Sequence, residues 1–348
     1  MKNMLLLPIC LVLFSPFSVG QVTDVITGLN EPNRLFRFGD YLFFTHSNSS
    51  ISKFDFTVDP PVVIDLAAGL GELGSMALHG NDLYFTRFQG NIVSKIDITA
   101  SAPVPVDVVT GIDKPNGLVL HGDELYISQS LNGTISKIDL TQPNPTPAEV
   151  VGGMDFPSCM AIQDNYLYVS EIWGDKISRI DLADSLPALT SVITGIDGPI
   201  GLQFHGNELF IVESSGGRIL MADVTDDLPI PLQELATGLD SPSDLALGGN
   251  EIFVCGRYEG RIYKLDYVLS TKTAGVDSQI TLFPNPSNGF LFLSNVRDPT
   301  PYRIYSLDGK KVSEGEFVPG GQIDVRRLPP GMFVLQLAGG RAVPFVKR

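Results

Sequence analysis

A short phrase, Ser-Lys-Ile-Asp, recurs along the chain at a nearly constant interval and constrains the fold more than any other feature. The six copies, two of them degenerate, end at Asp55, Asp97, Asp139, Asp181, Asp223 and Asp266, with spacings of 42, 42, 42, 42 and 43 residues. A second series keeps the same phase, at Gly28, Gly69, Gly111, Gly153, Gly195 and Gly238. The chain therefore contains six copies of one structural unit, which must stack on one another or close into a ring.

Each repeat resolves into four short apolar runs that are separated by Gly, Asp, Asn or Pro. In the third repeat these runs are "GLVLH", "ELYIS", "TISKIDL" and "AEVVGG". Val, Ile, Tyr and Phe favour strands, and no repeat shows a helical pattern. Four strands at a period near 42 residues indicate one blade of a β-propeller.

The two ends of the repeat region complement each other. The sixth repeat stops after its third strand, at "RIYKLDYV", whereas "VTDVITGL" (22–29) is a spare fourth strand at the start. Pairing these two segments would complete the last blade and remove an open sheet edge. We therefore predict an all-β chain whose residues 21–268 form a six-bladed β-propeller.

The third repeat, "KPNGLVLHGDELYISQSLNGTISKIDL", resembles the repeats of NHL-type and virginiamycin-lyase-like propellers. Those repeats also run Pro-x-Gly, an apolar strand that ends in a polar residue, a Gly/Asn loop and an "I-x-[KR]-[IF]-D" strand. The resemblance implies the architecture only, because propellers host unrelated functions.

Residues 1–20 have the features of a secretory signal. Lys2 precedes an apolar core from Met4 to Phe14, and small residues lead to Gly20, after which we expect cleavage. No later stretch approaches eighteen apolar residues, so no transmembrane segment is expected in the mature chain. Only Cys159 and Cys255 remain after cleavage, and we expect them to be small core residues whose redox state the sequence leaves open.

Charge divides the chain unevenly. Residues 21–276 carry 14 basic and 33 acidic residues, a net charge of −19, whereas the chain from Asp277 onward carries nine basic and six acidic residues, a net charge of +3. Such an acidic body would repel nucleic acid and anionic lipid, so neither is an expected partner. The shift also suggests a boundary near residue 270, with a linker over 269–278.

Three of the four histidines, His79, His121 and His205, occupy the same phrase in different repeats. In a propeller this phrase is the hairpin turn between the first and second strands, which lies on one face of the ring. The three side chains would be spread around that rim, whereas metal ligands must lie within about 2 Å of one point. We expect turn residues there rather than a metal site.

Positions where the repeats differ indicate a candidate binding face, on the opposite side of the ring. The residue that ends the second strand is polar but changes identity: His46, Arg87, Gln129, Glu171, Glu213 and then Gly256. The following loops add Leu131, the sole tryptophan Trp173, and Tyr258, and the opening turns add Asn33, Asn116, Ser158 and Asp244. Two interpretations stay open: a mixed aromatic and polar ligand site, or polar residues that cap loops while Trp173 packs between blades. The ligand of the first interpretation could be an extracellular glycan, a peptide or another protein.

An enzymatic alternative comes from a second resemblance. "PNGLVLHGDELYISQS" is similar to the gluconolactonase (SMP-30-like) propellers, in which an asparagine before Gly-Leu coordinates a divalent metal. Asn116 matches that asparagine, but Ser158 stands where the family has a carboxylate, and the opening Glu-Gly-Pro phrase is absent. We therefore predict no cofactor and no catalytic residue, with Asn116 as the one candidate metal ligand. A lactonase or lyase that acts on a small polar substrate remains the alternative function.

The C-terminal part has a different pattern. "LFPNPSNGFLFLSN" (282–295), "YRIYSLDGKKV" (302–312), "IDVRRLPPGMFVLQL" (323–337) and a basic end, "FVKR", predict a small antiparallel β-sandwich-like domain. The order of these phrases resembles the type A C-terminal sorting domain of the type IX secretion system. The resemblance implies that residues 279–348 bind the secretion machinery and direct the protein through the periplasm to the cell surface or outside. A small adhesion domain is the alternative, and the sequence leaves open whether the mature protein is anchored.

Overall fold

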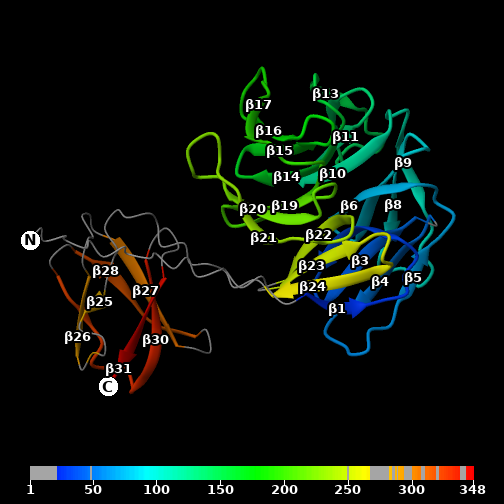
Figure 1. The fold of residues 1–348 in the computed structure, drawn as a ribbon. Coiled ribbons are helices and arrows are strands. Elements are labelled where there is room, and N and C mark those ends of the chain that lie inside the picture. The colour runs from blue at the N-terminus through cyan, green and yellow to red at the C-terminus, as the bar shows by residue number, and fades with distance from the viewer. Residues whose placement is uncertain are drawn as a thin grey trace, which may run out of the picture. The chain divides into compact units, whose positions relative to one another are not determined.

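The computed structural model describes residues 22–47, 49–248, 251–266, 282–283, 287, 289–293, 300–306, 310–318, 321–337 and 342–348. The predicted signal (1–20) and linker (269–278) lie outside these residues. The chain divides into two compact units, Met1–Val268 and Leu269–Arg348 (Figure 1). None of the described residues belongs to a helix that could span a membrane.

The described strands of the first unit form six four-stranded antiparallel sheets. In chain order the first three sheets contain β2 (Pro32–Phe38), β3 (Tyr41–His46), β4 (Ile51–Asp55) and β5 (Ile64–Ala67); β6 (Leu73–His79), β7 (Asp82–Arg87), β8 (Ile92–Asp97) and β9 (Val106–Thr110); and β10 (Pro115–His121), β11 (Glu124–Gln129), β12 (Thr134–Asp139) and β13 (Ala148–Val151). The other three contain β14 (Pro157–Gln163), β15 (Tyr166–Glu171), β16 (Lys176–Asp181) and β17 (Thr190–Thr194); β18 (Pro199–His205), β19 (Glu208–Glu213), β20 (Arg218–Asp223) and β21 (Gln233–Ala236); and β22 (Pro242–Gly248), β23 (Glu251–Gly256), β24 (Arg261–Asp266) and β1 (Val22–Ile26).

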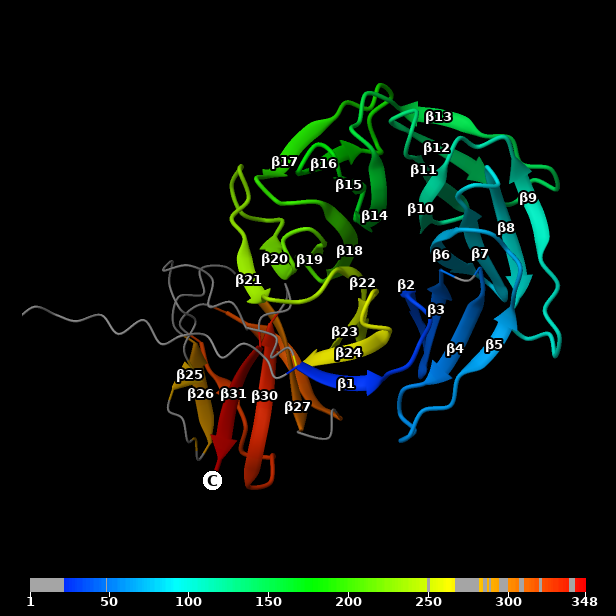
Figure 2. The same ribbon diagram turned by 45° about the vertical axis from the view of Figure 1, so that its right-hand side comes forward.

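The innermost strands form a closed ring. β2, β6, β10, β14, β18 and β22 each contact the next innermost strand, and β22 contacts β2 (Figure 2). The ring is completed as the spare N-terminal strand predicts, because β1 pairs with β24 and places Val22 opposite Leu265. Repeated four-stranded antiparallel sheets around one axis are the arrangement of a β-propeller, which confirms the predicted all-β propeller architecture.

A β-bulge interrupts the innermost strand of each sheet and explains why hydroxyl residues recur near the end of the second strand. In the third sheet the register shifts between Pro115 and Leu118. The Gly117 amide N–H, displaced from the ladder, donates to Ser128 Oγ at 2.7 Å, and Ser128 Oγ donates to Ser158 O of the next sheet at 2.7 Å. The Ser128 hydroxyl therefore gives the N–H at the bulge a hydrogen-bond partner and also links two sheets.

The repeated Lys and Asp of the Ser-Lys-Ile-Asp phrase are used within each sheet. Lys95 Nζ donates to Asp82 at 2.6 Å and lies over the ring of Tyr84. Asp97 Oδ1 accepts from the backbone N–H of Thr99 at 2.8 Å and so starts the turn after its strand. These residues repeat because every sheet is built in the same way.

Apolar side chains pack between neighbouring sheets and leave both cysteines in the core. Cys159 is 8% exposed and Cys255 is fully buried, and the two are free thiols. Burial raises the pKa of Cys159 to about 11, so its thiol stays protonated at neutral pH.

The second unit contains two sheets in its described residues. One has the order β28 (Lys311–Phe317), β27 (Thr300–Ser306), β30 (Gly331–Leu337) and β31 (Ala342–Lys347), and the other has the order β25 (Leu282–Phe283), β26 (Phe290–Leu293) and β29 (Ile323–Asp324). Leu291, Ile304, Leu335 and Phe345 belong to a core shared by these sheets. A small antiparallel β domain is what the sequence of this part predicts.

Candidate functional site

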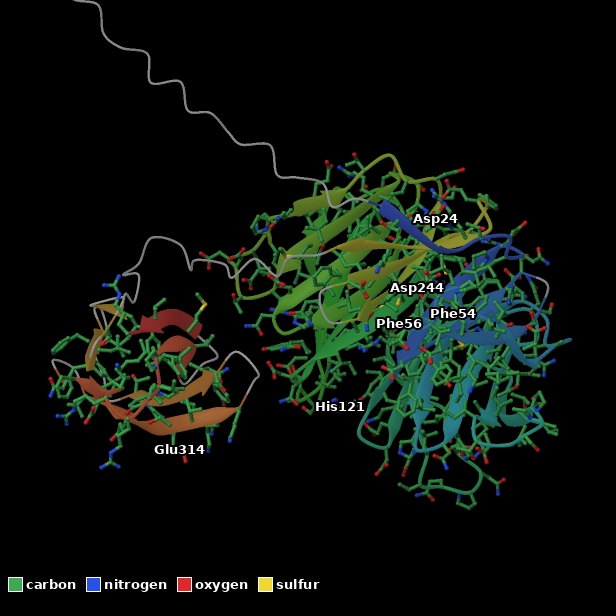
Figure 3. All side chains as sticks on the ribbon, turned by 90° about the horizontal axis from the view of Figure 1, so that it is seen from below. Asp24, Phe54, Phe56, His121, Asp244 and Glu314 are labelled. Carbon is green, nitrogen blue, oxygen red and sulfur yellow. The ribbon has the colours of Figure 1, made fainter. Side chains whose placement is uncertain are left out.

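The three repeated histidines lie in hairpin turns of three different sheets, at the ends of β6, β10 and β18. Each pairs across its turn with an acidic residue, as His121 does with Glu124. His79 Nε2 also lies 2.9 Å from Asp123 Oδ1 in the turn of the next sheet. Figure 3 shows His121 well separated from Asp244. Within the described part of the chain, no three His, Cys, Asp or Glu side chains converge on a point that could hold a metal ion.

The polar residues that end the second strands are largely turned into the protein. Glu171 and Glu213 are fully buried. Glu171 Oε2 accepts from the Asp155 N–H at 2.8 Å, and Lys176 Nζ lies 3.3 Å from the same oxygen. Glu171 therefore holds the turn that opens the first strand of its own sheet.

Glu213 has the same arrangement with a stronger cation. Its Oε1 accepts from the Asp197 N–H at 2.6 Å and from Arg218 Nη2 at 2.6 Å, and Oε2 accepts from Arg218 Nε. Burial alone would raise the pKa of Glu213, but hydrogen bonds from Arg218 and Asp197 outweigh it, and the pKa lies below its ordinary value.

Three further members of the series also bind their own sheet. Gln129 Oε1 accepts from the Asp113 N–H at 3.0 Å, and Arg87 Nε donates to Leu70 O at 2.7 Å. His46 Nε2 lies 2.9 Å from Ser52 Oγ, and burial lowers the pKa of His46. Different side chains thus perform one positioning role. Most of them tie the start of the loop that follows the second strand to the turn that opens the first strand of the same sheet.

Those loops carry exposed apolar side chains at their tips. Leu131, Trp173 and Tyr258 are 57, 69 and 66% exposed. Trp173 stacks on Phe156, with ring centroids 4.2 Å apart and planes inclined by 29°. We call this side of the ring the loop face. Its exposed carboxylates include Asp155, Asp175, Asp197, Asp240 and Glu259.

The opening turns bring polar side chains to the ring axis, where Arg34 holds them. Arg34 is 3% exposed and donates to Ser243 O at 3.3 Å, to Asn116 Oδ1 at 2.9 Å and to Ser158 Oγ at 3.2 Å. Ser158 belongs to the sheet on the opposite side of the ring, so the Arg34 side chain spans the central channel. Asn33 turns to the neighbouring sheet instead, with its Nδ2 at 3.4 Å from Leu73 O.

Sequence reasoning missed Arg34, although a signal was present. The corresponding position of the six repeats reads Arg34, Ser75, Gly117, Cys159, Gly201 and Asp244. Small residues occupy four of these positions, and the first and last repeats place opposite charges there. Asp244 is buried, and burial raises its pKa to about 6 although the charge of Arg34 opposes this shift.

Asn116 does not offer a divalent cation a suitable site. Its Oδ1, the atom that would bind a metal, accepts the hydrogen bond from the Arg34 guanidinium. Its Nδ2 donates to Ser130 Oγ at 3.3 Å and to Ser158 Oγ at 3.2 Å. A cation at this oxygen would be repelled by Arg34, and Ser158 supplies no negative charge to compensate.

Comparison with known proteins identifies the C-terminal part. Residues 281–347 match the family described as the secretion system C-terminal sorting domain. The predicted sorting domain is thereby confirmed, and it directs export through the type IX secretion system to the cell surface or outside. Among curated proteins, none matches this chain.

Solved structures similar to the first unit are β-propellers. An auxiliary nutrient binding protein from Bacteroides thetaiotaomicron matches with a TM-score of 0.60 at 13% identity, over 70% of this chain and 75% of that chain. A luciferin-regenerating enzyme matches with a TM-score of 0.58 at 11% identity, over 72% of this chain and 96% of that chain. Virginiamycin B lyase from Staphylococcus aureus matches with a TM-score of 0.53 at 14% identity, over 71% of this chain and 99% of that chain. At these identities the likeness shows the fold alone.

Proposed function

We propose that residues 21–268 form a six-bladed β-propeller that serves as an extracellular binding module. The sorting domain delivers it to the surface or outside, and the loop face binds the ligand. The loop face is the candidate surface because aromatic side chains are exposed there on a rigid scaffold, as is typical of recognition surfaces.

The observation that carries the proposal is Trp173. A large apolar ring that is 69% exposed gains free energy when a ligand covers it. Stacking on Phe156 holds the indole in place, so little side-chain entropy is lost on binding. The buried Glu171, two residues earlier, accepts from the Asp155 N–H and so ties this loop to the opening turn that carries Phe156.

The chemistry of the loop face favours a glycan among the candidate ligands. A flat aromatic ring packs against the apolar face of a sugar, and carboxylates accept hydrogen bonds from sugar hydroxyl groups. Asp155 and Asp175 are exposed acids on either side of Phe156 and Trp173 in sequence. A peptide or a surface protein would use the same aromatic ring but gain less from these acids. One of the similar structures is described as a nutrient binding protein, which agrees with a binding role.

A glycan array probed with the mature chain tests this proposal. Trp173→Ala should weaken binding to the best glycan by at least about tenfold, as for a central aromatic contact residue. Tyr166→Ala is the matched control, because Tyr166 is a partly exposed aromatic residue at the opposite end of the same strand pair. Equal binding by the Trp173→Ala variant and the control would place the ligand elsewhere.

An enzymatic role, as a lactonase or lyase, is the second candidate. The observation that favours it is Asp244, a buried carboxyl at the ring axis whose pKa of about 6 lies in the range of general acids and bases. Turnover of a lactone by the mature chain that is lost in Asp244→Asn would support this candidate. A folded mature chain without turnover on lactones would remove it.

A further inference from the structure

The exposed Trp173 lies among three carboxylates of the loop face. Asp155 and Asp175 are exposed residues of the fourth sheet, and Asp197 is an exposed residue in the opening turn of the fifth sheet. Asp155 directly precedes Phe156, on which the indole stacks. We call Asp155, Phe156, Trp173, Asp175 and Asp197 the Trp173 patch.

Local contacts hold these carboxylates beside the tryptophan loop. A Cβ atom added at Gly174, the residue after the tryptophan, would lie 3.3 Å from the Cβ atom of Asp155. Asp175 Oδ1 accepts from the Gly198 N–H at 3.1 Å, which ties the loop to the opening turn that contains Asp197. The aromatic ring and the acids therefore belong to one connected surface.

The cations near the Trp173 patch are already paired with other groups. At the loop end of the fourth and fifth sheets, Lys176 pairs with the buried Glu171, and Arg218 pairs with the buried Glu213. Lys114 of the third sheet donates to a side chain of the second sheet, on the side away from the fourth sheet. The carboxylates of the patch have no ion partner among the described residues, so the patch attracts positive charge.

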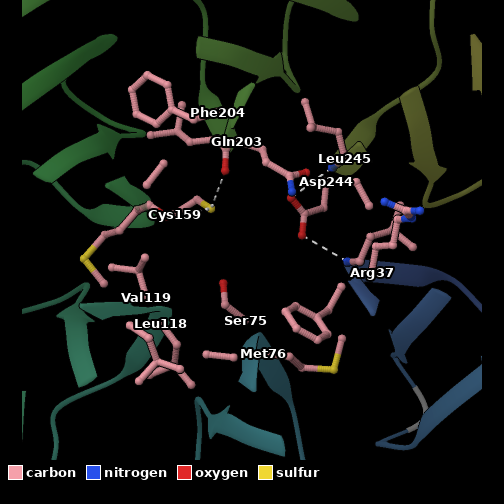
Figure 4. Close-up of a pocket in the computed structure, with 18 of the residues that line it drawn as sticks. Arg37, Ser75, Met76, Leu118, Val119, Cys159, Gln203, Phe204, Asp244 and Leu245 are labelled. Atoms are coloured by element: carbon pink, nitrogen blue, oxygen red, sulfur yellow. Dashed lines mark hydrogen bonds between the residues drawn. The ribbon is translucent and has the colours of Figure 1, made fainter. Parts of the chain in front are cut away.

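The central channel does not attract positive charge in the same way. Its cavity of about 400 Å³ is lined by all six innermost strands (Figure 4). Arg37 and Asp244 both line this cavity, and Arg34 spans the channel next to it. A cationic ligand would meet two arginines and one carboxyl group there, but only carboxylates at the Trp173 patch. A positively charged group is therefore directed to the loop face.

An aromatic ring with carboxylates beside it suits a sugar that carries an amino group. A pyranose ring that stacks on the indole directs its equatorial substituents outward, past the edge of the indole. A protonated amino group in such a position can donate three hydrogen bonds, and its bonds to a carboxylate are charge-assisted. A sugar hydroxyl group is uncharged and gains less from the same carboxylates.

We propose that the loop-face ligand is a glycan of amino sugars whose amino groups are free and protonated. This inference rests on the proposed function, because it names the class of glycan that the loop face binds. One sugar ring covers Trp173, and its ammonium group donates to Asp155 or Asp175. Asp197 attracts the ammonium group of a neighbouring sugar.

Calorimetric titration of the mature chain with two oligosaccharides that differ only in charge tests the inference. The chitosan hexamer carries free amino groups, whereas the chitin hexamer carries an acetyl group on every nitrogen. At pH 6 the chitosan hexamer should bind at least about tenfold more tightly, because only its ammonium groups gain from the carboxylates. Raising the salt concentration from about 50 mM to about 500 mM should reduce the difference to about twofold, since salt screens exposed charges.

A double variant, Asp155→Asn with Asp175→Asn, separates the acids from the aromatic ring. It should weaken chitosan binding about tenfold through the loss of two exposed ionic contacts and leave chitin binding unchanged. Asparagine still offers the Gly198 N–H an acceptor, and it tolerates the positive φ of 48° at position 175. The matched control is Asp164→Asn with Asp184→Asn, two exposed acids at the opposite end of the same sheet, which should bind as the parent does.

Four results would overturn the inference. They are no binding of the chitosan hexamer, equal affinity for both hexamers, unchanged chitosan affinity in the Asp155→Asn, Asp175→Asn variant, and hexalysine binding as tightly as the chitosan hexamer. Equal affinity for both hexamers that Trp173→Ala weakens would leave the loop-face proposal standing. Binding of either hexamer that Trp173→Ala leaves unchanged would instead contradict the loop-face proposal itself.

Discussion

Replacing Arg34 by methionine tests how much the buried cation at the ring axis stabilises the propeller. The substitution removes the charge that spans the channel but keeps most of the side-chain volume. The guanidinium makes three hydrogen bonds to other sheets and acts on the buried Asp244. Removing one partner of a buried charge pair costs about 3–5 kcal/mol of unfolding free energy. We expect a loss of this size at pH 7.

The loss should also depend on pH. Burial raises the pKa of Asp244 from 3.8 to about 6, so the folded state binds the proton more tightly than the unfolded state. The stabilisation from this proton is complete below the unfolded pKa and disappears as pH rises through the folded pKa, a change of about 3 kcal/mol between pH 4 and pH 6. Without Arg34 the pKa of Asp244 rises further, so the stabilisation from its proton is lost over a pH range that extends above pH 6. Arg34→Met should therefore be more destabilising at pH 8 than at pH 5.

Urea unfolding at both pH values, followed by the fluorescence of Trp173, measures this effect. Trp173 is the only tryptophan and belongs to the first unit, so its signal reports that unit alone. Arg37→Met is the matched control: Arg37 donates to Leu247 O at 3.4 Å and lies over the Phe56 ring, and its loss should cost about 1 kcal/mol at either pH. This role of Arg34 is refuted if Arg34→Met lowers the unfolding free energy no more than Arg37→Met does, or lowers it equally at pH 5 and pH 8.

Two further predictions concern the loop face and the tail. Glu213→Gln should lower the unfolding free energy by about 2 kcal/mol at pH 7, and the loss should shrink as pH falls below the ordinary value of 4.5, because the lowered pKa of Glu213 stabilises only while the carboxyl is ionised; an effect that does not change with pH would argue against the buried ion pair. Deletion of 279–348 should leave a folded propeller in the periplasm when cell fractions are probed, and normal surface delivery of this truncation would contradict the sorting role.

The repeat made most of the fold predictable, because period, strand composition and the spare N-terminal strand are all local properties of the sequence. "VTDVITGL" and "RIYKLDYV" each lack a partner in their own repeat, and β1 pairs with β24 as this predicts. The C-terminal phrases were similarly informative, since the family match covers 281–347.

The directions of the polar side chains were harder to predict. Glu171 and Glu213 are acids next to loops, which suggests exposure, yet both are buried because the loop amides require acceptors. Arg34 follows Asn33 directly, and only the bulge in its strand decides which of the two reaches the axis. A bulge changes the direction of the side chains that follow it but does not change the residue spacing of the repeats.

The fluorescence of Trp173 tests most directly whether the exported propeller binds its ligand at the loop face, as we propose. The indole is the only one in the chain and is 69% exposed. Titration of the mature chain with the best glycan from the array should shift its emission to shorter wavelength, with the same midpoint as binding measured calorimetrically. Calorimetric binding with unchanged Trp173 emission would contradict the claim.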